Sequence, residues 1–170
     1  GKVTVSGATI TAKNYGIYNL GTANTTSAPA VKVTSGNVES TGATSIYNDA
    51  TEGMVYLTGG TIKQAGANST LYNNKTGTIQ ISGATITHTA TAGSAIFNYS
   101  TGKINVTSGT ITSSKGYGIN NNAAGTITIS GGSITSNTSN GIGNGTTGSI
   151  VVTGGSKALI NLCPEDACLN

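Results

Sequence analysis

The sequence predicts an all-β fold: a right-handed parallel β-helix, or solenoid, of about seven coils with three short strands in each coil. Three observations predict it. A repeat of 23–25 residues recurs through most of the 170-residue chain, each repeat carries three short apolar signals in a fixed order, and β-branched residues dominate those signals. Repeats of this size cannot bury an apolar face alone, and they bury it by stacking on one another.

The composition alone would suggest disorder. Only 8% of the residues are charged, 26 are Gly, and Thr, Ser and Asn make up much of the remainder. Polar, Gly-rich chains usually lack enough apolar surface to fold. Here the apolar residues recur in phase, and this periodicity argues for an ordered, repetitive core.

The first strand of each repeat is an apolar-x-apolar pattern, as in Ile79-Gln80-Ile81. A period of two is expected for a strand with one buried face. Ser-Gly or Gly-Gly follows, and we expect a tight corner there because Gly tolerates positive φ. The copies of this strand begin at Val3, Val31, Val55, Ile79, Ile104 and Ile127.

The second strand centres on one apolar residue with polar neighbours, and the third follows a turn of variable length and reads apolar-x-Asn. In stacked coils each strand pairs with its own copy about 4.8 Å away. Inward-facing asparagines would then bond to one another in a ladder along the axis. The alternative is a set of unrelated turn residues. The six asparagines are Asn19, Asn48, Asn73, Asn98, Asn121 and Asn144.

The unequal sides of each repeat indicate the right-handed form, because left-handed β-helices use regular hexapeptides with near-equal sides. Calcium-binding Gly-Gly-x-Gly-x-Asp repeats are absent from the sequence. We expect coils over residues 1–152, with a long protruding loop near 20–30, and a C-terminal cap or lead-out over 153–170. The first repeat shows no cap, so we expect another coil or domain before it.

The two cysteines, Cys163 and Cys168, lie in the expected cap. Their spacing predicts a small local disulfide in an oxidising compartment, with two free thiols as the alternative. A metal site is not expected, because the single histidine, His88, is far away in the sequence. We expect His88 to be exposed beside the second strand, since it follows Thr87.

Net charge is +3, from eight lysines and five acids, and the chain has no Arg. Such weak, scattered charge excludes a typical nucleic-acid reader. No apolar run is long enough to span a bilayer. No cofactor motif is present, and we expect no cofactor.

Two stretches of the repeat resemble those of a known family. The stretches 125–135 (GTITISGGSIT) and 117–121 (YGINN) resemble the repeats of bacterial cell-surface proteins of the pectate-lyase-like right-handed β-helix class, adhesin-like proteins included. The resemblance covers nearly the whole chain. It implies the fold, but members of that class include lyases, hydrolases, adhesins and phage tail proteins, and fold does not settle function.

The resemblance implies that an enzyme of that class would carry clustered acids on one face of the helix. Asp49 and Glu52 are near enough to share a turn, but a solvated turn is the simpler interpretation. There is no Arg to hold a substrate carboxylate. We therefore predict no catalytic residues and no enzyme activity. The acids of the chain are Glu39, Asp49, Glu52, Glu165 and Asp166.

An aromatic residue follows the inward apolar residue of the third strand in four successive repeats, and alternation should point it outward. Such a strip could bind sugar rings or another protein, because Tyr combines a large area with a polar tip. The alternative is cross-strand stacking that only stabilises the sheet, by about 0.2–1 kcal/mol a pair. The strip consists of Tyr18, Tyr47, Tyr72 and Phe97.

Threonines flank the inward residue of the second strand and should form two outward columns. They resemble the Thr-x-Thr arrays of ice-binding β-solenoid proteins. Glu39 and Lys63 interrupt the columns, and Thr is also an ordinary residue for an exposed strand. The candidate ice-binding residues are Thr9, Thr11, Thr85, Thr87, Thr110, Thr112 and Thr135.

These features favour a non-enzymatic, secreted or cell-surface adhesion or stalk module. Its expected partners are a glycan or a host or cell-surface protein, and copies are expected to stack end to end because uncovered strand edges invite pairing. The alternatives are an ice-binding protein and a carbohydrate-binding or carbohydrate-active fragment.

Overall fold

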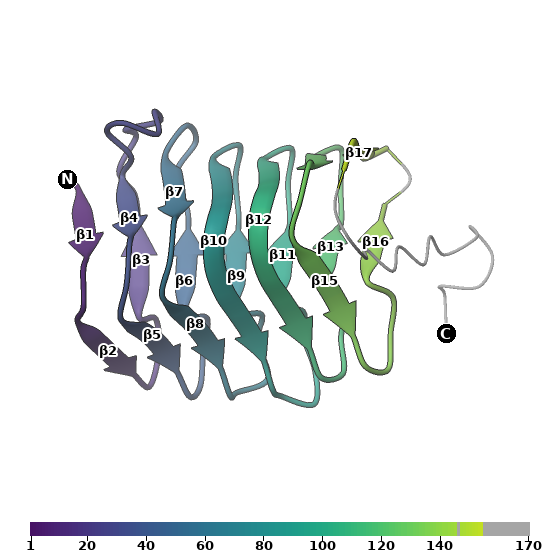
Figure 1. The fold of residues 1–170 in the computed structure, drawn as a ribbon, viewed down its shortest axis with the longest axis horizontal. Helices are drawn as coiled ribbons and strands as arrows, with labels where there is room; N and C mark the ends of the chain where they lie inside the picture. Colours follow the sequence, from purple (N-terminus) through teal and green to yellow (C-terminus); the bar gives the residue numbers. More distant parts are fainter. Residues whose placement is uncertain (146, 155–170) are drawn as a thin grey trace.

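The computed structural model describes residues 1–145 and 147–154, and it confirms the predicted fold. The described chain is a right-handed parallel β-helix with six complete coils and the first strand of a seventh (Figure 1). Every pair of neighbouring strands is parallel, because each strand pairs with its counterpart one coil away. No helix occurs in these residues.

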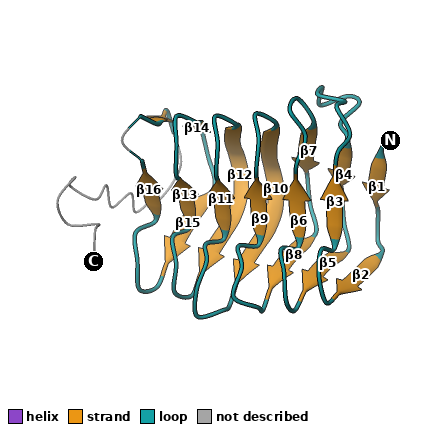
Figure 2. Cartoon of the chain, turned by 180° about the vertical axis from the view of Figure 1, so that it is seen from behind, coloured by secondary structure: helices purple, strands orange, loops and turns teal. Residues whose placement is uncertain are grey.

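The strands form three rows along the axis, one row for each predicted signal. The first row holds β1 (Val3–Val5), β4 (Val31–Val33), β7 (Met54–Leu57), the start of β10 (Thr78–His88), the start of β12 (Lys103–Ser113), β14 (Thr126–Ile129) and β17 (Ser149–Val152). The second row holds β2 (Thr9–Ala12), β5 (Asn37–Ser40), β8 (Thr61–Gln64), the ends of β10 and β12, and β15 (Ser133–Ser136). The third row holds β3 (Ile17–Asn19), β6 (Ile46–Asn48), β9 (Leu71–Asn73), β11 (Ile96–Asn98), β13 (Ile119–Asn121) and β16 (Ile142–Asn144). The third row is nearest the viewer in Figure 2.

Two coils depart from the expected three strands, because β10 and β12 run without a break through the first corner. The first and second rows therefore join into one 11-stranded sheet, while the third row is a separate 6-stranded sheet. The corner glycines explain the difference. Gly7 and Gly60 have φ of 76° and 79°, whereas Gly83 and Gly109 are more extended, at 147° and 108°. A wider corner lets the ladder continue with an irregularity of register instead of a turn.

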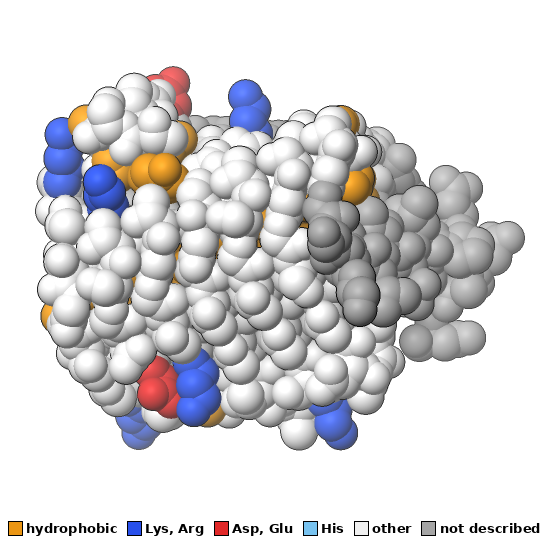
Figure 3. Space-filling model, in the orientation of Figure 1, with side chains coloured by type: hydrophobic (Ala, Val, Ile, Leu, Met, Phe, Trp, Pro, Cys, Tyr) orange, Lys and Arg blue, Asp and Glu red, His pale blue; other side chains and the backbone are white. Residues whose placement is uncertain are grey.

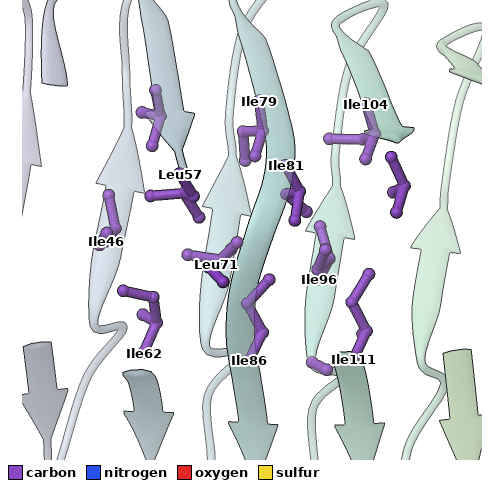
Figure 4. Packing of buried hydrophobic residues seen from close by; sticks show 14 of the residues in the cluster. Ile46, Leu57, Ile62, Leu71, Ile79, Ile81, Ile86, Ile96, Ile104 and Ile111 are labelled. Carbon is purple, nitrogen blue, oxygen red and sulfur yellow. The ribbon is translucent and has the colours of Figure 1, made fainter. Parts of the chain in front are cut away.

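Inward residues of all three rows fill the interior with stacked Ile, Val and Leu (Figure 4). Each apolar residue lies over its counterpart in the next coil, as Ile86 lies over Ile111 and Ile62 lies over Ile86. Most of these side chains are fully buried. Burying one such side chain stabilises the fold by about 1.5–3 kcal/mol.

The first coil carries the predicted long loop, which protrudes beside β4 in Figure 1. An antiparallel bridge between Asn24 and Pro29 closes it, and the Ala30 amide N–H donates to the Ala23 carbonyl at 3.0 Å. The predicted cap begins at 153, and all but its first two residues, Cys163 and Cys168 included, lie outside the described residues.

Candidate functional site: an aromatic face on the third row

An asparagine ladder fixes the geometry of the third row, as predicted. Each third-row strand has an inward apolar residue, an outward residue and an inward asparagine. The side-chain Nδ2 of each asparagine donates to Oδ1 of the next, at 2.7 to 2.9 Å over five successive steps. Because these amides are paired, and all but that of Asn144 are buried, they hold the outward residues in register. The ladder runs from Asn19 through Asn48, Asn73, Asn98 and Asn121 to Asn144.

Glycines beside the ladder belong to the same device, and the sequence analysis did not single them out. The second N–H of each ladder amide donates to a glycine carbonyl shortly after it, as Asn98 does to Gly102 at 2.9 Å. A Cβ on Gly125 would collide with the amides of Asn98 and Asn121. The signal was present in the sequence: a glycine follows four of the asparagines at a spacing of four residues. These glycines are Gly77, Gly102, Gly125 and Gly148.

The four predicted aromatic side chains stack in one line along the third row. The ring centroids of Tyr18 and Tyr47 are 5.2 Å apart, those of Tyr47 and Tyr72 are 4.9 Å apart, and those of Tyr72 and Phe97 are 5.1 Å apart. We call these four rings the aromatic strip. The first two pairs are close to parallel, at 7° and 12°. Offset stacking at these spacings stabilises a pair by about 0.5–1.5 kcal/mol.

Two further tyrosines widen the strip, and the sequence analysis missed both. The Tyr15 ring lies 5.2 Å from Tyr18 and 5.1 Å from Tyr47, and the Tyr99 ring lies 6.1 Å from Tyr72. They lie in the turns before β3 and after β11, outside the repeated block, so periodicity did not reveal them. We call the six rings together the aromatic face. Its exposure is considerable: Tyr15 is 43%, Tyr18 47% and Tyr99 50% exposed.

One carboxylate anchors the N-terminal end of this face. The Tyr18 hydroxyl donates to Asp49 at 2.6 Å, the Asn74 amide donates to Asp49 at 2.8 Å, and the Lys75 ammonium lies 3.4 Å away. The bond to Asp49 raises the pKa of Tyr18 to about 12, and the same bond, with that from Asn74, lowers the pKa of Asp49. Asp49 is thus an ionised structural partner of the face.

The pKa values of the other two tyrosines of the strip are shifted chiefly by burial. Desolvation raises the pKa of Tyr72 to about 12 and also raises the pKa of Tyr47. Both hydroxyls therefore stay protonated at any physiological pH and can donate hydrogen bonds to a ligand.

A groove of about 380 Å³ opens at the other end of the aromatic face. Its lining includes Tyr72, Phe97, Tyr99, Tyr117 and Asn120. The strip ends here because Asn120 and then Gly143 occupy the outward positions that follow Phe97. Gly143 lets the Tyr117 ring lie against the backbone, where a Cβ would come within 2.9 Å of that ring. Tyr117 and Asn120 were not predicted as site residues.

The predicted threonine columns are present on the second row. Thr85 pairs with Thr110, and Thr87 pairs with Thr112, which in turn pairs with Thr135. In the first coils the columns are broken, because Thr9 pairs with Asn37 and Thr11 pairs with Glu39. Glu39 and Lys63 are in the same column and form an ion pair at 3.5 Å. Figure 3 shows this side of the molecule, which carries few charges.

The expectation that His88 is exposed was wrong. His88 is 0% exposed, because the second strand continues one residue further than the sequence suggested and alternation turns that residue inward. It lies in an inward polar column with Gln64 and Ser113. Its Nε2 lies 3.0 Å from the Asn68 carbonyl, and its Nδ1 lies 3.4 Å from the Ser113 hydroxyl. Burial lowers the pKa of His88, and hydrogen bonds to the Asn68 and Ala92 backbone partly oppose this shift.

The remaining candidates form no chemical cluster in the described part of the chain. Asp49 is occupied by Tyr18, Asn74 and Lys75, and Glu52 is exposed in the turn that follows. Among residues 1–145 and 147–154, no three His, Cys, Asp or Glu side chains are grouped to hold a metal ion. Over the same residues no helix is long and apolar enough to cross a membrane.

Comparison with known proteins adds no assignment. No family matches the chain, and no curated protein and no solved structure proved similar to it.

Proposed function

We propose that this chain is a non-enzymatic adhesion module of a secreted or cell-surface protein, in which a rigid solenoid presents the aromatic face to a ligand. The observation that carries the proposal is the aromatic face itself. Six rings from four coils lie together on one surface, and three of them are more than two fifths exposed. Contiguous exposed patches of this kind usually mark interaction sites.

The scaffold suits that role. The asparagine ladder and the paired strands hold the rings in fixed positions, so little conformational entropy is lost when a ligand binds. Tyrosine is also the residue type that combines contact area with few rotatable bonds. The few acids that the structure describes are separated or engaged in ion pairs, which favours binding over catalysis.

The proposal is tested by adhesion. Beads coated with the 170-residue chain are applied under flow to mucin-coated glass and to albumin-coated glass. We expect retention on mucin that falls in Tyr47→Ala. The matched control is Tyr56→Ala, since Tyr56 is a half-buried tyrosine of β7 in the first row, away from the face. Equal retention of all three proteins, or equal retention on both surfaces, would count against the proposal.

The edge of the first strand also favours one variant of this proposal, the end-to-end stacking of copies. Within the described residues β1 pairs only with β4, so its outer edge keeps unpaired backbone groups, and Val3 of this strand is 41% exposed. Such edges are templates for further strands. Sedimentation velocity over a wide concentration range tests the variant, and a monomer at every concentration would reject it.

Ice binding is the second candidate, and the in-register threonines of the last coils favour it. Thr85 and Thr87 are followed in register by Thr110 and Thr112 on one exposed sheet. The Glu39–Lys63 ion pair confines any flat hydroxyl array to the coils beyond it. A thermal-hysteresis measurement tests ice binding, and Thr110→Tyr is the variant that would abolish the hysteresis. Absence of hysteresis in the wild type at high concentration would end this candidate.

A further inference from the structure

We infer that the groove beside Tyr117 is a binding site for one uncharged pyranose ring of a glycan. This inference rests on the proposed function and deepens it, because it names both the ligand class and the place on the aromatic face. Four aromatic rings line the groove: Tyr72, Phe97, Tyr99 and Tyr117. Its volume of about 380 Å³ lies within the range typical of small-ligand sites, about 300–1,000 Å³.

The groove exists because the periodic pattern of the solenoid fails at one place. In the third row the outward positions read Tyr72, Phe97, Asn120 and Gly143 in successive coils. A small amide and then a glycine replace the large rings, and these smaller residues leave a depression in the surface. The Tyr117 ring, which comes from the preceding turn, packs over Gly143 and closes the far side. Small turn residues keep the floor low, since Gly93 and Gly116 also line the groove.

The ring geometry suits the flat CH face of a sugar. The Tyr99 ring is inclined by 30° to Tyr72 and by 27° to Phe97, with centroids 6.1 and 6.2 Å away. Tyr99 thus stacks beside the end of the strip, and the open sides of the three rings border the groove. Aromatic faces carry partial negative charge and attract weakly positive CH groups placed on them.

Polar groups surround these rings, as the hydroxyl rim of a sugar requires. The structure describes no hydrogen bond from the side-chain amide of Asn120 or from the hydroxyls of Tyr72, Tyr99 and Tyr117 to any other residue of the described chain. These groups are free to bond a ligand. Buried or half-buried polar groups in a site give specificity for the ligand that pairs with them.

Charge and backbone pairing then exclude other occupants. No charged side chain lines the groove, so an acidic sugar or a charged peptide would lose hydration without gaining a counter-ion. An extended peptide usually adds to a free strand edge. Here β11 is paired on both sides, with β9 and with β13, and offers no such edge. An uncharged sugar ring fits both conditions.

The experiment is a glycan-array screen of neutral and acidic oligosaccharides, followed by calorimetric titration with the strongest neutral binder. The proteins are the wild type, Tyr117→Ala, Tyr99→Ala, Asn120→Ala, one control and one variant at the far end of the aromatic face. The control Tyr56→Ala removes a tyrosine outside the aromatic face. Tyr18→Ala removes a ring at the end of the face opposite to the groove. Thermal unfolding of each variant confirms that it is folded.

We expect the wild type to bind neutral glycans and each groove variant to lose at least about tenfold in affinity, equivalent to about 1.4 kcal/mol. Tyr56→Ala should bind as the wild type does, and Tyr18→Ala should lose less affinity than any groove variant. Loss in Tyr18→Ala with full binding in Tyr117→Ala would overturn the groove as the site while leaving adhesion by the aromatic face intact. Binding of acidic glycans alone, or of no glycan by a folded wild type, would overturn the inference, and in that case the mucin adhesion assay still judges the proposed function separately.

Discussion

Replacing one ladder asparagine tests the central structural claim, that paired amides hold the third row together. Asn121 is fully buried and makes three side-chain hydrogen bonds. Its Nδ2 donates to the Gly125 carbonyl at 2.9 Å and to Asn144 at 2.8 Å, and its Oδ1 accepts from Asn98 at 2.8 Å. The neighbouring Asn120, on the same strand, points outward and is half-buried. Asn121→Ala and Asn120→Ala therefore form a matched pair that differs only in the face of the strand.

The expected magnitude follows from the groups left behind. Asn121→Ala leaves one buried N–H of Asn98 unpaired, and such a group costs about 1–3 kcal/mol. The Gly125 carbonyl loses the Asn121 amide but keeps its bond from the Ser149 N–H at 2.9 Å. Asn144 is exposed and its oxygen can be hydrated. We therefore expect a loss of about 2 kcal/mol of stability, or about 4–8 °C in Tm for a chain of this size.

Thermal unfolding followed by far-ultraviolet circular dichroism measures the difference. Asn120→Ala should unfold within about 2 °C of the wild type, since outward substitutions usually change stability by less than about 0.5 kcal/mol. Asn121→Asp should be at least as unstable as Asn121→Ala at neutral pH, because a carboxylate accepts from Asn98 but has no N–H for Gly125. Equal unfolding temperatures for Asn120→Ala and Asn121→Ala would refute the ladder as a source of stability.

Three further changes follow from the same geometry. Gly125→Ala should destabilise the fold by about 2–4 kcal/mol in urea unfolding, because its Cβ overlaps two ladder amides; unchanged stability would show that the ladder can shift. For His88 the folded pKa lies below the unfolded value of 6.5. As the pH is lowered through about 6.5 the unfolded state takes up the proton first, so the stability of the fold decreases as the pH decreases. His88→Gln should flatten the Tm profile between about pH 7 and 5, and parallel profiles would contradict this. Asp49→Asn should lower the pKa of Tyr18 from about 12 towards 10 in an ultraviolet titration of the phenols, and no shift would show that the bond to Asp49 is not its main cause.

The sequence was informative wherever the coils repeat. Inward residues and the asparagines recur at fixed positions, so alternation alone predicted the buried face, the ladder and the outward strip. It failed at His88 because polar residues occupy the last inward position of the second strand. Gln64, His88 and Ser113 share that column, and a pattern search based on apolar residues reads them as outside. It also missed that Gly83 and Gly109 open the corner far enough for two strands to merge.

The groove could not be predicted for a related reason. Tyr99 and Tyr117 lie in turns, where the repeat length varies, and their positions depend on how each turn is routed over the next coil. Tyr117 reaches its place only because Gly143, 26 residues later and one coil away, has no side chain. A sequence pattern contains both residues but gives no sign that they meet.

Extending the aromatic strip would separate its structural role from a binding role. In Asn120→Tyr a fifth ring would follow Phe97 in register and fill the groove next to Tyr117. If the rings serve only to stabilise the sheet, this variant should gain about 0.5–1.5 kcal/mol from the added pair and bind ligands as before. If the break in the pattern is the site, the variant should be as stable as the wild type or more so, yet lose neutral-glycan binding in calorimetric titration. Retained neutral-glycan binding by a folded Asn120→Tyr protein would refute the groove as the site, because a filled groove that still binds cannot be where the ligand lies.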